Sequence, residues 1–318
     1  MTDQKVSIFG GGSVGLCLAA NFVKAGAQVT LLVRKGVVEH LQDSPITVTG
    51  LLGDHQIAPG AVSICDAANP DADVLSCEML VLTTKAYDVA DALAPFAGQT
   101  TCPPVLLLQN GMGSAEIARD ILGPDVPIFS SAMMIGMVRH NPTEVEVTAM
   151  SSPILCGPLL GDDTASLVRM IDIAKTGFVP MEYDPHIRDT ISFKLLFNTC
   201  MNPTGAITGQ TFGELLSDPQ SRALIVGLAD ETLAVFDKAY GYRPAKSGQH
   251  YVDDILSKII FPNGAGHRSS MLQDVQSGRQ TEIDFATGAV IRLANSVDLP
   301  AIRHQSILQL ITARTSKL

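Results

Sequence analysis

The sequence contains no tryptophan and is poor in charged residues, which make up 17% of its 318 positions. Acidic side chains outnumber basic ones, with 32 Asp and Glu against 22 Lys and Arg, so the formal net charge is −10. A surface of this sign repels nucleic acid phosphates and anionic lipid headgroups. We therefore expect no nucleic acid partner and no membrane partner, and an anionic substrate would need a local cationic pocket.

The chain also lacks paired cysteines and long apolar runs. Its six cysteines form no C-x-x-C pair and lie apart from histidine clusters, so neither a zinc site nor a disulfide framework is expected. No window approaches the roughly 20 apolar residues that a bilayer span needs, and the N-terminus enters a strand without a cleavable apolar leader. These absences predict a cytoplasmic protein without a metal site.

The length and texture of the chain predict two domains. Hydrophobic residues make up 46% of the sequence, which is enough for substantial cores. From residue 6 to about 183, short apolar strands alternate with helical patterns, as in a parallel sheet covered on both faces. From residue 185, apolar residues recur at i, i+3 and i+4 and strand-like alternation almost disappears. We predict an α/β sheet domain over 1–184 and an all-helical domain over 185–318.

The predicted strands are short apolar runs that end in polar or glycine residues. They cover 6–9, 29–33, 79–82, 105–108, 128–131, 144–148, 153–156 and 178–182. A segment of alternating apolar residues with glycine breaks predicts a small hairpin or sheet extension over 46–64. The helical patterns cover 163–175, 186–200, 221–240, 253–260, 270–276, 283–296 and 303–315.

The first chemical signal is a glycine loop after the first predicted strand. Gly10, Gly12 and Gly15 have G-x-G-x-x-G spacing, with Ser13 and Val14 between them at the start of the next helix. The glycines suit a tight turn, a close backbone approach to a pyrophosphate, and close helix–strand packing. The loop therefore predicts dinucleotide binding by a Rossmann-type domain, and an ordinary structural turn is the alternative.

The end of the second predicted strand bears on the choice of dinucleotide. NAD sites usually have Asp or Glu about 20 residues after the glycines, whereas Arg34 and Lys35 stand here and no carboxylate follows until Glu39. Two cations suit a 2′-phosphate through charge-assisted hydrogen bonds. NADP (as NADPH) is therefore the expected cofactor, unless both cations merely belong to a solvated loop.

Lys85 and Asn110 each stand shortly after another predicted strand. Lys85 follows the strand over 79–82, and Asn110 follows the strand over 105–108. Open α/β sheets bind ligands at the carboxyl ends of parallel strands, where both residues would lie. Taken alone, Lys85 is compatible with a surface charge, and Asn110 with an ordinary Asn-Gly turn. Their common location favours a role in binding for both.

The helical half supplies a candidate acid. Lys194 and Asn198 are four residues apart and share one helix face. Pro203 predicts that this helix ends there and that Asn202 leaves helical geometry. A lone lysine on such a helix also commonly extends into solvent.

A second polar cluster lies in the segment SSMLQDVQSGRQTEID, which contains Ser270 and Glu282. Such residues could complete a site with Lys194. Glu282 is equally compatible with the first turn of the helix that follows it, where an acid is favoured by the helix dipole.

Five separated motifs together resemble the ketopantoate reductase (2-dehydropantoate 2-reductase) family in order and spacing. They are FGGGSVG, TTKAYD, LLLQNGM, FKLLFNTCMNPTGAIT and SSMLQDVQSGRQTEIDFATG, and they extend over nearly the whole chain. The resemblance implies an NADPH-binding Rossmann domain joined to a helical domain, with a small 2-keto acid bound between them. It implies reduction of ketopantoate to pantoate, a step of pantothenate biosynthesis.

Carried over residue by residue, the resemblance assigns roles to the candidates. Lys194 matches the family's catalytic lysine, a general acid, and Glu282 matches its glutamate. The cofactor positions are Gly10, Gly12, Ser13, Val14, Gly15, Arg34, Lys85 and Asn110, and the substrate positions are Asn110, Asn198, Asn202 and Ser270.

Two residues depart from the family's pattern. Ser192 stands where tryptophan is frequent, and His267 stands where asparagine is common. Ketopantoate is therefore less certain than the reaction class, and an NAD(P)-dependent dehydrogenase or reductase of another branched or bulkier 2-keto or 2-hydroxy acid is retained. A non-catalytic cofactor-binding protein is disfavoured because both Lys194 and Glu282 are present. The sequence leaves a homodimer open.

Overall fold

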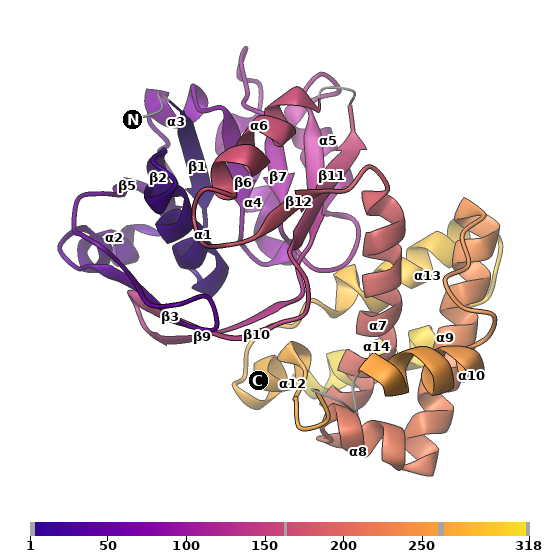
Figure 1. Ribbon diagram of the computed structural model, residues 1–318. Helices are drawn as coiled ribbons and strands as arrows, with labels where there is room; N and C mark the ends of the chain where they lie inside the picture. Colours follow the sequence, from indigo (N-terminus) through magenta and orange to yellow (C-terminus); the bar gives the residue numbers. More distant parts are fainter. Residues whose placement is uncertain (1–3, 162–163, 260–263, 316–318) are drawn as a thin grey trace. The chain divides into compact units, whose positions relative to one another are not determined.

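The computed structural model describes residues 4–161, 164–259 and 264–315 (Figure 1). The chain divides into two compact units, each described by itself below. The first unit consists of residues 1–109 and 114–188, and the second of residues 110–113 and 189–318. The short segment 110–113 thus belongs with the helical half of the chain. A single predicted boundary at residue 184 does not account for this segment.

The first unit is built on an eight-stranded sheet with the order β12-β11-β8-β7-β6-β1-β2-β5. Its neighbouring strands pair in parallel except β8 and β11, which are antiparallel. The α/β class is confirmed. The strands are β1 (Lys5–Phe9), β2 (Gln28–Val33), β5 (Ser63–Asp66), β6 (Met79–Leu82), β7 (Val105–Leu107), β8 (Ile128–Ala132), β11 (Ile154–Leu160) and β12 (Met181–Tyr183).

The antiparallel pair corrects the expectation of a uniformly parallel sheet. Between β8 and β11 the chain forms two further strands and no helix. Because a parallel return needs a long crossover, usually a helix, β11 comes back in the opposite direction.

Those two strands, β9 (Ile135–Asn141) and β10 (Glu144–Met150), belong to a second sheet with the order β4-β3-β10-β9. β3 (Ile46–Gly50) and β4 (His55–Ile57) form the predicted hairpin, and β3 pairs in parallel with β10. This small sheet packs on α1 (Ser13–Lys24). Since β3 and β10 are far apart in the sequence, no local pattern predicts that they pair.

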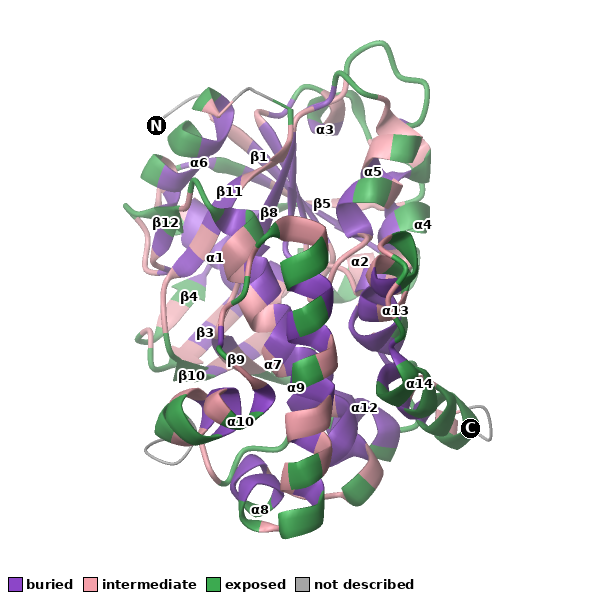
Figure 2. Ribbon diagram, turned by 90° about the vertical axis from the view of Figure 1, so that its right-hand side faces the viewer, coloured by how far each residue is buried: buried purple, intermediate pink, exposed green. Residues whose placement is uncertain are grey.

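Helices cover both faces of the large sheet, because successive strand residues point to opposite sides. Val6 and Ile8 of β1 pack in the core beneath α1, whereas Phe9 packs in the core of the opposite face. Figure 2 shows the central strands of this sheet as buried, and in β1, β6, β7 and β8 at most one residue per strand is not buried. The other helices of the unit are α2 (Lys35–Gln42), α3 (Ala72–Leu75), η1 (Ala86–Asp88), α4 (Val89–Leu93), η2 (Ala94–Phe96), α5 (Ser114–Leu122) and α6 (Ala165–Ala174).

The second unit is helical, and its described residues contain no strand. None of the helices in the described part of the chain is both long and apolar enough to cross a membrane. The predicted helix ends at residues 163 and 260 lie outside the described residues. The helices are α7 (Ile187–Thr208), α8 (Phe212–Ser217), α9 (Pro219–Tyr240), α10 (Gly248–His250), the π-helix η3 (Tyr251–Leu256), α12 (Ser270–Gln276), η4 (Ile283–Phe285), α13 (Thr287–Ser296) and α14 (Ile302–Thr315).

The ends of α9 illustrate how the sequence sets these helices. The Asp218 carboxylate accepts a hydrogen bond from Ser221 N at 2.7 Å, and Pro219 occupies the first helical position, where its missing N–H costs nothing. At the other end Gly241 has φ of +63°, the left-handed conformation that stops a helix.

Helix α7 continues through Pro203, which corrects the prediction that the helix ends there and that Asn202 leaves it. A proline inside a helix costs about 3 kcal/mol. The helix persists because Met201, Pro203 and Ala206 are buried, with Met201 and Ala206 in the apolar core of the second unit, and this packing outweighs the local preference. As a result Asn202 lies one turn beyond Asn198 on the same side of the helix.

Candidate functional site

The glycine loop connects β1 to α1 and is tightly packed at two of its three glycines. Gly10 has φ of +120°, and a Cβ there would lie 2.7 Å from Oγ1 of Thr83. A Cβ on Gly15 would collide with the carbonyl oxygen of Gly10. At Gly12, in contrast, no described atom lies within 4 Å of the place a Cβ would take. The loop therefore has no room for a side chain at Gly10 or Gly15. Beside Gly12, directly before α1, the space that a side chain would take holds no described atom.

Ser13 and Val14 form the first residues of α1 and are partly buried. Thr83, which sequence reasoning missed, holds the loop in place from the end of β6. Its Oγ1 donates to the carbonyl oxygens of Phe9 at 3.1 Å and Gly10 at 3.0 Å. The signal that identifies it is its position, since it is the first polar residue after a buried parallel strand.

Two buried side-chain oxygens at the same edge of the sheet have no hydrogen-bond partner among the described residues: Thr84 Oγ1 and Gln109 Oε1. The Gln109 amide nitrogen is engaged, because Nε2 donates to the carbonyl oxygens of Leu82 and Thr84, each at 3.1 Å. Buried polar atoms are rarely left unsatisfied in proteins. These two oxygens therefore fit a polar ligand at this edge.

Arg34 and Lys85 lie at the same edge, because β2, β1 and β6 are neighbours in the sheet. Arg34 precedes α2, its side chain is 86% exposed, and its Nη2 lies 3.6 Å from Oδ2 of Asp88. Lys85 is the N-cap residue of η1 and is partly buried. The structure thus brings together the cofactor candidates of the first unit and adds Asp88, which sequence reasoning missed.

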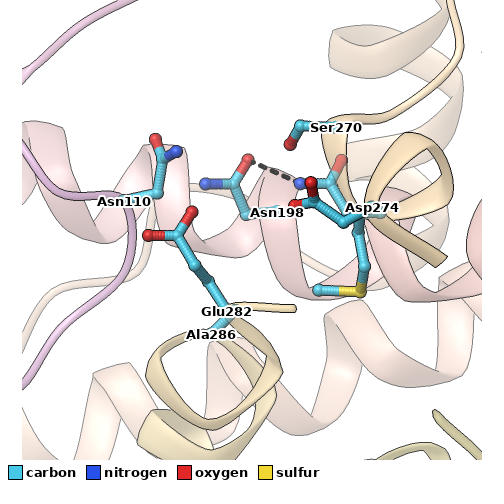
Figure 3. A pocket seen from close by; sticks show the side chains of 8 residues that line it. Asn110, Asn198, Ser270, Asp274, Glu282 and Ala286 are labelled. Atoms are coloured by element: carbon cyan, nitrogen blue, oxygen red, sulfur yellow. Dashed lines mark hydrogen bonds between the residues drawn. The ribbon is translucent and has the colours of Figure 1, made fainter. Parts of the chain in front are cut away.

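A small pocket in the second unit gathers all four predicted substrate residues and Glu282 (Figure 3). Nδ2 of Asn202 donates to Oδ1 of Asn198 at 3.3 Å, so these two side chains form one polar row along α7. In Figure 3 the Glu282 carboxylate points toward Asn110 and Asn198. The remaining lining residues are Ser270, Met271, Asp274 and Ala286.

Asn110 reaches this pocket because its loop is fastened to η4. Gly111 has φ of +89°, and a Cβ there would collide with the carbonyl oxygen of Phe285. The same carbonyl accepts a hydrogen bond from Met112 N at 2.9 Å. Since Glu282 is the N-cap residue of η4, this contact places Asn110 beside Glu282. The Asn-Gly pair therefore does more than turn the chain.

Lys194 lies one turn before Asn198 on α7 and is partly buried. Burial lowers the pKa of its ammonium group from 10.5 to about 8, because the charged form loses hydration, and the nearby Glu282 carboxylate opposes this shift. A lysine extended into solvent would keep its ordinary pKa. Lys194 can therefore gain and lose a proton near neutral pH.

Asp274 is a lining residue that sequence reasoning noted only as part of a polar cluster. Its carboxylate is 8% exposed and pairs with Arg279, Oδ1 to Nε, at 2.9 Å. Its four-residue spacing from Ser270, which places both on one side of α12, is the signal that could have identified it. Ser192 is buried and His267 exposed, and neither lines the pocket formed by the described residues.

Two family models match the chain over most of its length. The ketopantoate reductase PanE/ApbA model matches residues 6–161, and the model for the C-terminal part of that family matches residues 186–315. The chain belongs to the ketopantoate reductase family. The predicted family and the oxidoreductase class are confirmed.

Sequence relatives agree with this assignment, and solved structures share the fold. The 2-dehydropantoate 2-reductase of Aquifex aeolicus is 26% identical over 98% of this chain and 97% of its own, and that of Vibrio cholerae is 30% identical over 91% and 90%. The 2-dehydropantoate 2-reductase structure from Geobacter metallireducens has a TM-score of 0.83 at 21% identity over 97% of this chain and 99% of its own. D-mandelate dehydrogenase, solved with NADH and anilino(oxo)acetate, has a TM-score of 0.83 at 19% identity over 99% of each chain. These two structures share the fold.

Proposed function

We propose that this ketopantoate reductase family member reduces 2-dehydropantoate to pantoate with NADPH, the step expected in pantothenate biosynthesis. One observation carries the proposal. A lysine with a pKa of about 8 stands on the same helix as two asparagines, and these asparagines share a pocket with Asn110 and Glu282. A proton donor poised near neutral pH next to neutral hydrogen-bond donors suits the reduction of an anionic keto acid.

The first unit offers the residues that would hold the cofactor. The loop leaves space beside Gly12, and Arg34 is exposed at the end of β2. Thr84 Oγ1 and Gln109 Oε1 are buried without a hydrogen-bond partner among the described residues. Lys85 adds a second cation at this edge. When bound, the cofactor supplies the hydride that reduces the keto carbon.

The residues of the second unit then have separate tasks. The Lys194 ammonium donates its proton to the former keto oxygen as that oxygen becomes a hydroxyl. Glu282 holds the ammonium in place and accepts a hydrogen bond from a substrate hydroxyl. Asn198, Asn202 and Ser270 donate hydrogen bonds to the substrate carboxylate and so orient the keto group. These donors accommodate an anionic substrate despite the acidic composition of the chain.

A second candidate is an NAD(P)-dependent dehydrogenase of a bulkier 2-hydroxy acid. The fold shared with D-mandelate dehydrogenase favours it. The two candidates use the same lysine and differ in the side chain that the pocket accepts and in the cofactor.

A steady-state assay of NADPH and NADH oxidation separates the candidates. We expect the highest kcat/KM with NADPH and 2-dehydropantoate, and lower values with 3-methyl-2-oxobutanoate, which lacks the hydroxymethyl group. A preference for phenylglyoxylate, the keto form of mandelate, would support the second candidate instead. If the wild-type protein turned over no 2-keto acid while the Lys194→Ala variant behaved identically, the proposal would be refuted.

A further inference from the structure

We propose that Asp88 reduces the preference of this protein for NADPH over NADH by competing with the cofactor's 2′-phosphate for Arg34. The inference rests on the proposed function, because it concerns one end of the proposed cofactor. From the sequence, the end of β2 lacks a nearby carboxylate. The structure supplies one from a distant segment, since Asp88 Oδ2 lies 3.6 Å from Arg34 Nη2.

The position of this ion pair connects it to the glycine loop. Arg34 directly follows β2, and Asp88 closes η1 after the end of β6. β1 lies between β2 and β6 in the sheet, so the two outer strands are about 10 Å apart, twice the spacing of neighbouring strands. The Arg34 and Asp88 side chains therefore meet across the end of β1, where the glycine loop begins at Gly10.

The exposure of the pair indicates that it contributes little to stability. The Arg34 side chain is 86% exposed and that of Asp88 is 32% exposed. Exposed ion pairs are weak and are screened by salt. Arg34 can therefore exchange the carboxylate for another anion at small cost. A phosphate monoester is the stronger partner because it carries up to two negative charges and can bond the guanidinium at two points, whereas the Asp88 carboxylate lies 3.6 Å from one nitrogen.

Asp88 has opposite effects on the two forms of the cofactor. Its carboxylate occupies Arg34 and repels a 2′-phosphate that approaches the same guanidinium. A ribose 2′-hydroxyl, in contrast, can donate a hydrogen bond to a carboxylate. The acid at the end of the second strand accepts such a bond in NAD sites. Asp88 thus narrows the preference for NADPH that Arg34 creates.

Two nucleotide fragments test this with the full-length protein by calorimetric titration. 2′,5′-ADP carries the phosphate at issue and 5′-AMP lacks it. For Asp88→Asn we expect 2′,5′-ADP to bind about three- to tenfold more tightly, the scale of one screened like-charge contact, while 5′-AMP binds equally or more weakly. The matched control is Asp91→Asn, which removes the same charge from an exposed position in α4 and should change neither affinity by more than about twofold.

A double variant shows whether Asp88 acts through Arg34. In an Arg34→Ala background, the gain from Asp88→Asn should fall to less than half its size in the wild type. The inference is overturned if Asp88→Asn leaves 2′,5′-ADP binding unchanged, or if Asp91→Asn strengthens it equally. A wild-type protein that binds neither fragment would instead refute the proposed cofactor site, so the two failures are distinguishable. Thermal unfolding of each variant confirms that it is folded.

Discussion

The pKa of Lys194 predicts how the reaction should depend on pH. The ammonium form donates the proton, so keto acid reduction should be fastest below the pKa and decline above it. With a pKa of about 8, roughly nine-tenths of the lysine is protonated at pH 7 and one-tenth at pH 9. We therefore expect kcat/KM for keto acid reduction to fall about tenfold between these pH values.

The structure also predicts how the Glu282 carboxylate affects this pH dependence. Burial lowers the lysine pKa, and the carboxylate partly restores it. Glu282→Gln removes the negative charge but keeps the shape of the side chain, so the pKa should drop further and the alkaline decline should begin at a lower pH. The measurement is a pH profile of kcat/KM from pH 6 to 10 for both proteins at constant ionic strength.

Two lysine variants complete this experiment. Lys194→Arg keeps a positive charge that is not lost between pH 7 and 9, so the rate of this variant, although lower, should be flat over this range. Lys194→Ala should lose about 10²- to 10⁴-fold in rate, while the dissociation constant of NADPH stays near the wild-type value. A wild-type profile that is flat from pH 7 to 9, or a Glu282→Gln decline displaced to higher pH, would refute the assignment of Lys194 as the acid.

Three further predictions concern the cofactor edge and the pocket. Arg34→Ala should weaken NADPH binding about 10- to 100-fold and leave NADH nearly unchanged, because a charge-assisted contact to the 2′-phosphate is lost; fluorescence titration of both cofactors measures this. Gly15→Ala should lower the unfolding temperature and weaken the binding of both cofactors, since its Cβ collides with the Gly10 carbonyl. Calorimetry and titration test this, and unchanged values of both quantities would contradict it. Asn202→Ala should raise KM for the keto acid without changing NADPH affinity, as steady-state kinetics can test.

The parts of the fold that the sequence predicts are those set by neighbouring residues. β1 and β6 are short apolar runs followed by glycine or polar residues, and these local patterns are sufficient to predict both strands and the ligand edge. The helical texture after residue 185 is local in the same sense. The pairing of β3 with β10 and the meeting of Arg34 with Asp88 join distant segments, and no periodicity encodes them.

The interpretation of Pro203 failed for a different physical reason. A proline usually ends a helix, but at this position the cost of about 3 kcal/mol competes with the burial of an entire helical turn. The free energy gained by this packing exceeds the cost of the proline. A sequence analysed one segment at a time does not show in which core the helical turn will be buried.

The persistence of α7 beyond the expected end has a consequence for the candidate site. Lys194, Asn198 and Asn202 recur every four residues, and only an unbroken helix places all three on one side. In a helix that ended before Pro203, helical spacing would not bring the Asn202 amide to Asn198, and their hydrogen bond would lose its support. Ser269, which caps α12 through Leu272 N, also donates to the carbonyl oxygen of Asn202. The local rule thus fails where a continuous helix orders the polar row, as is common at functional sites.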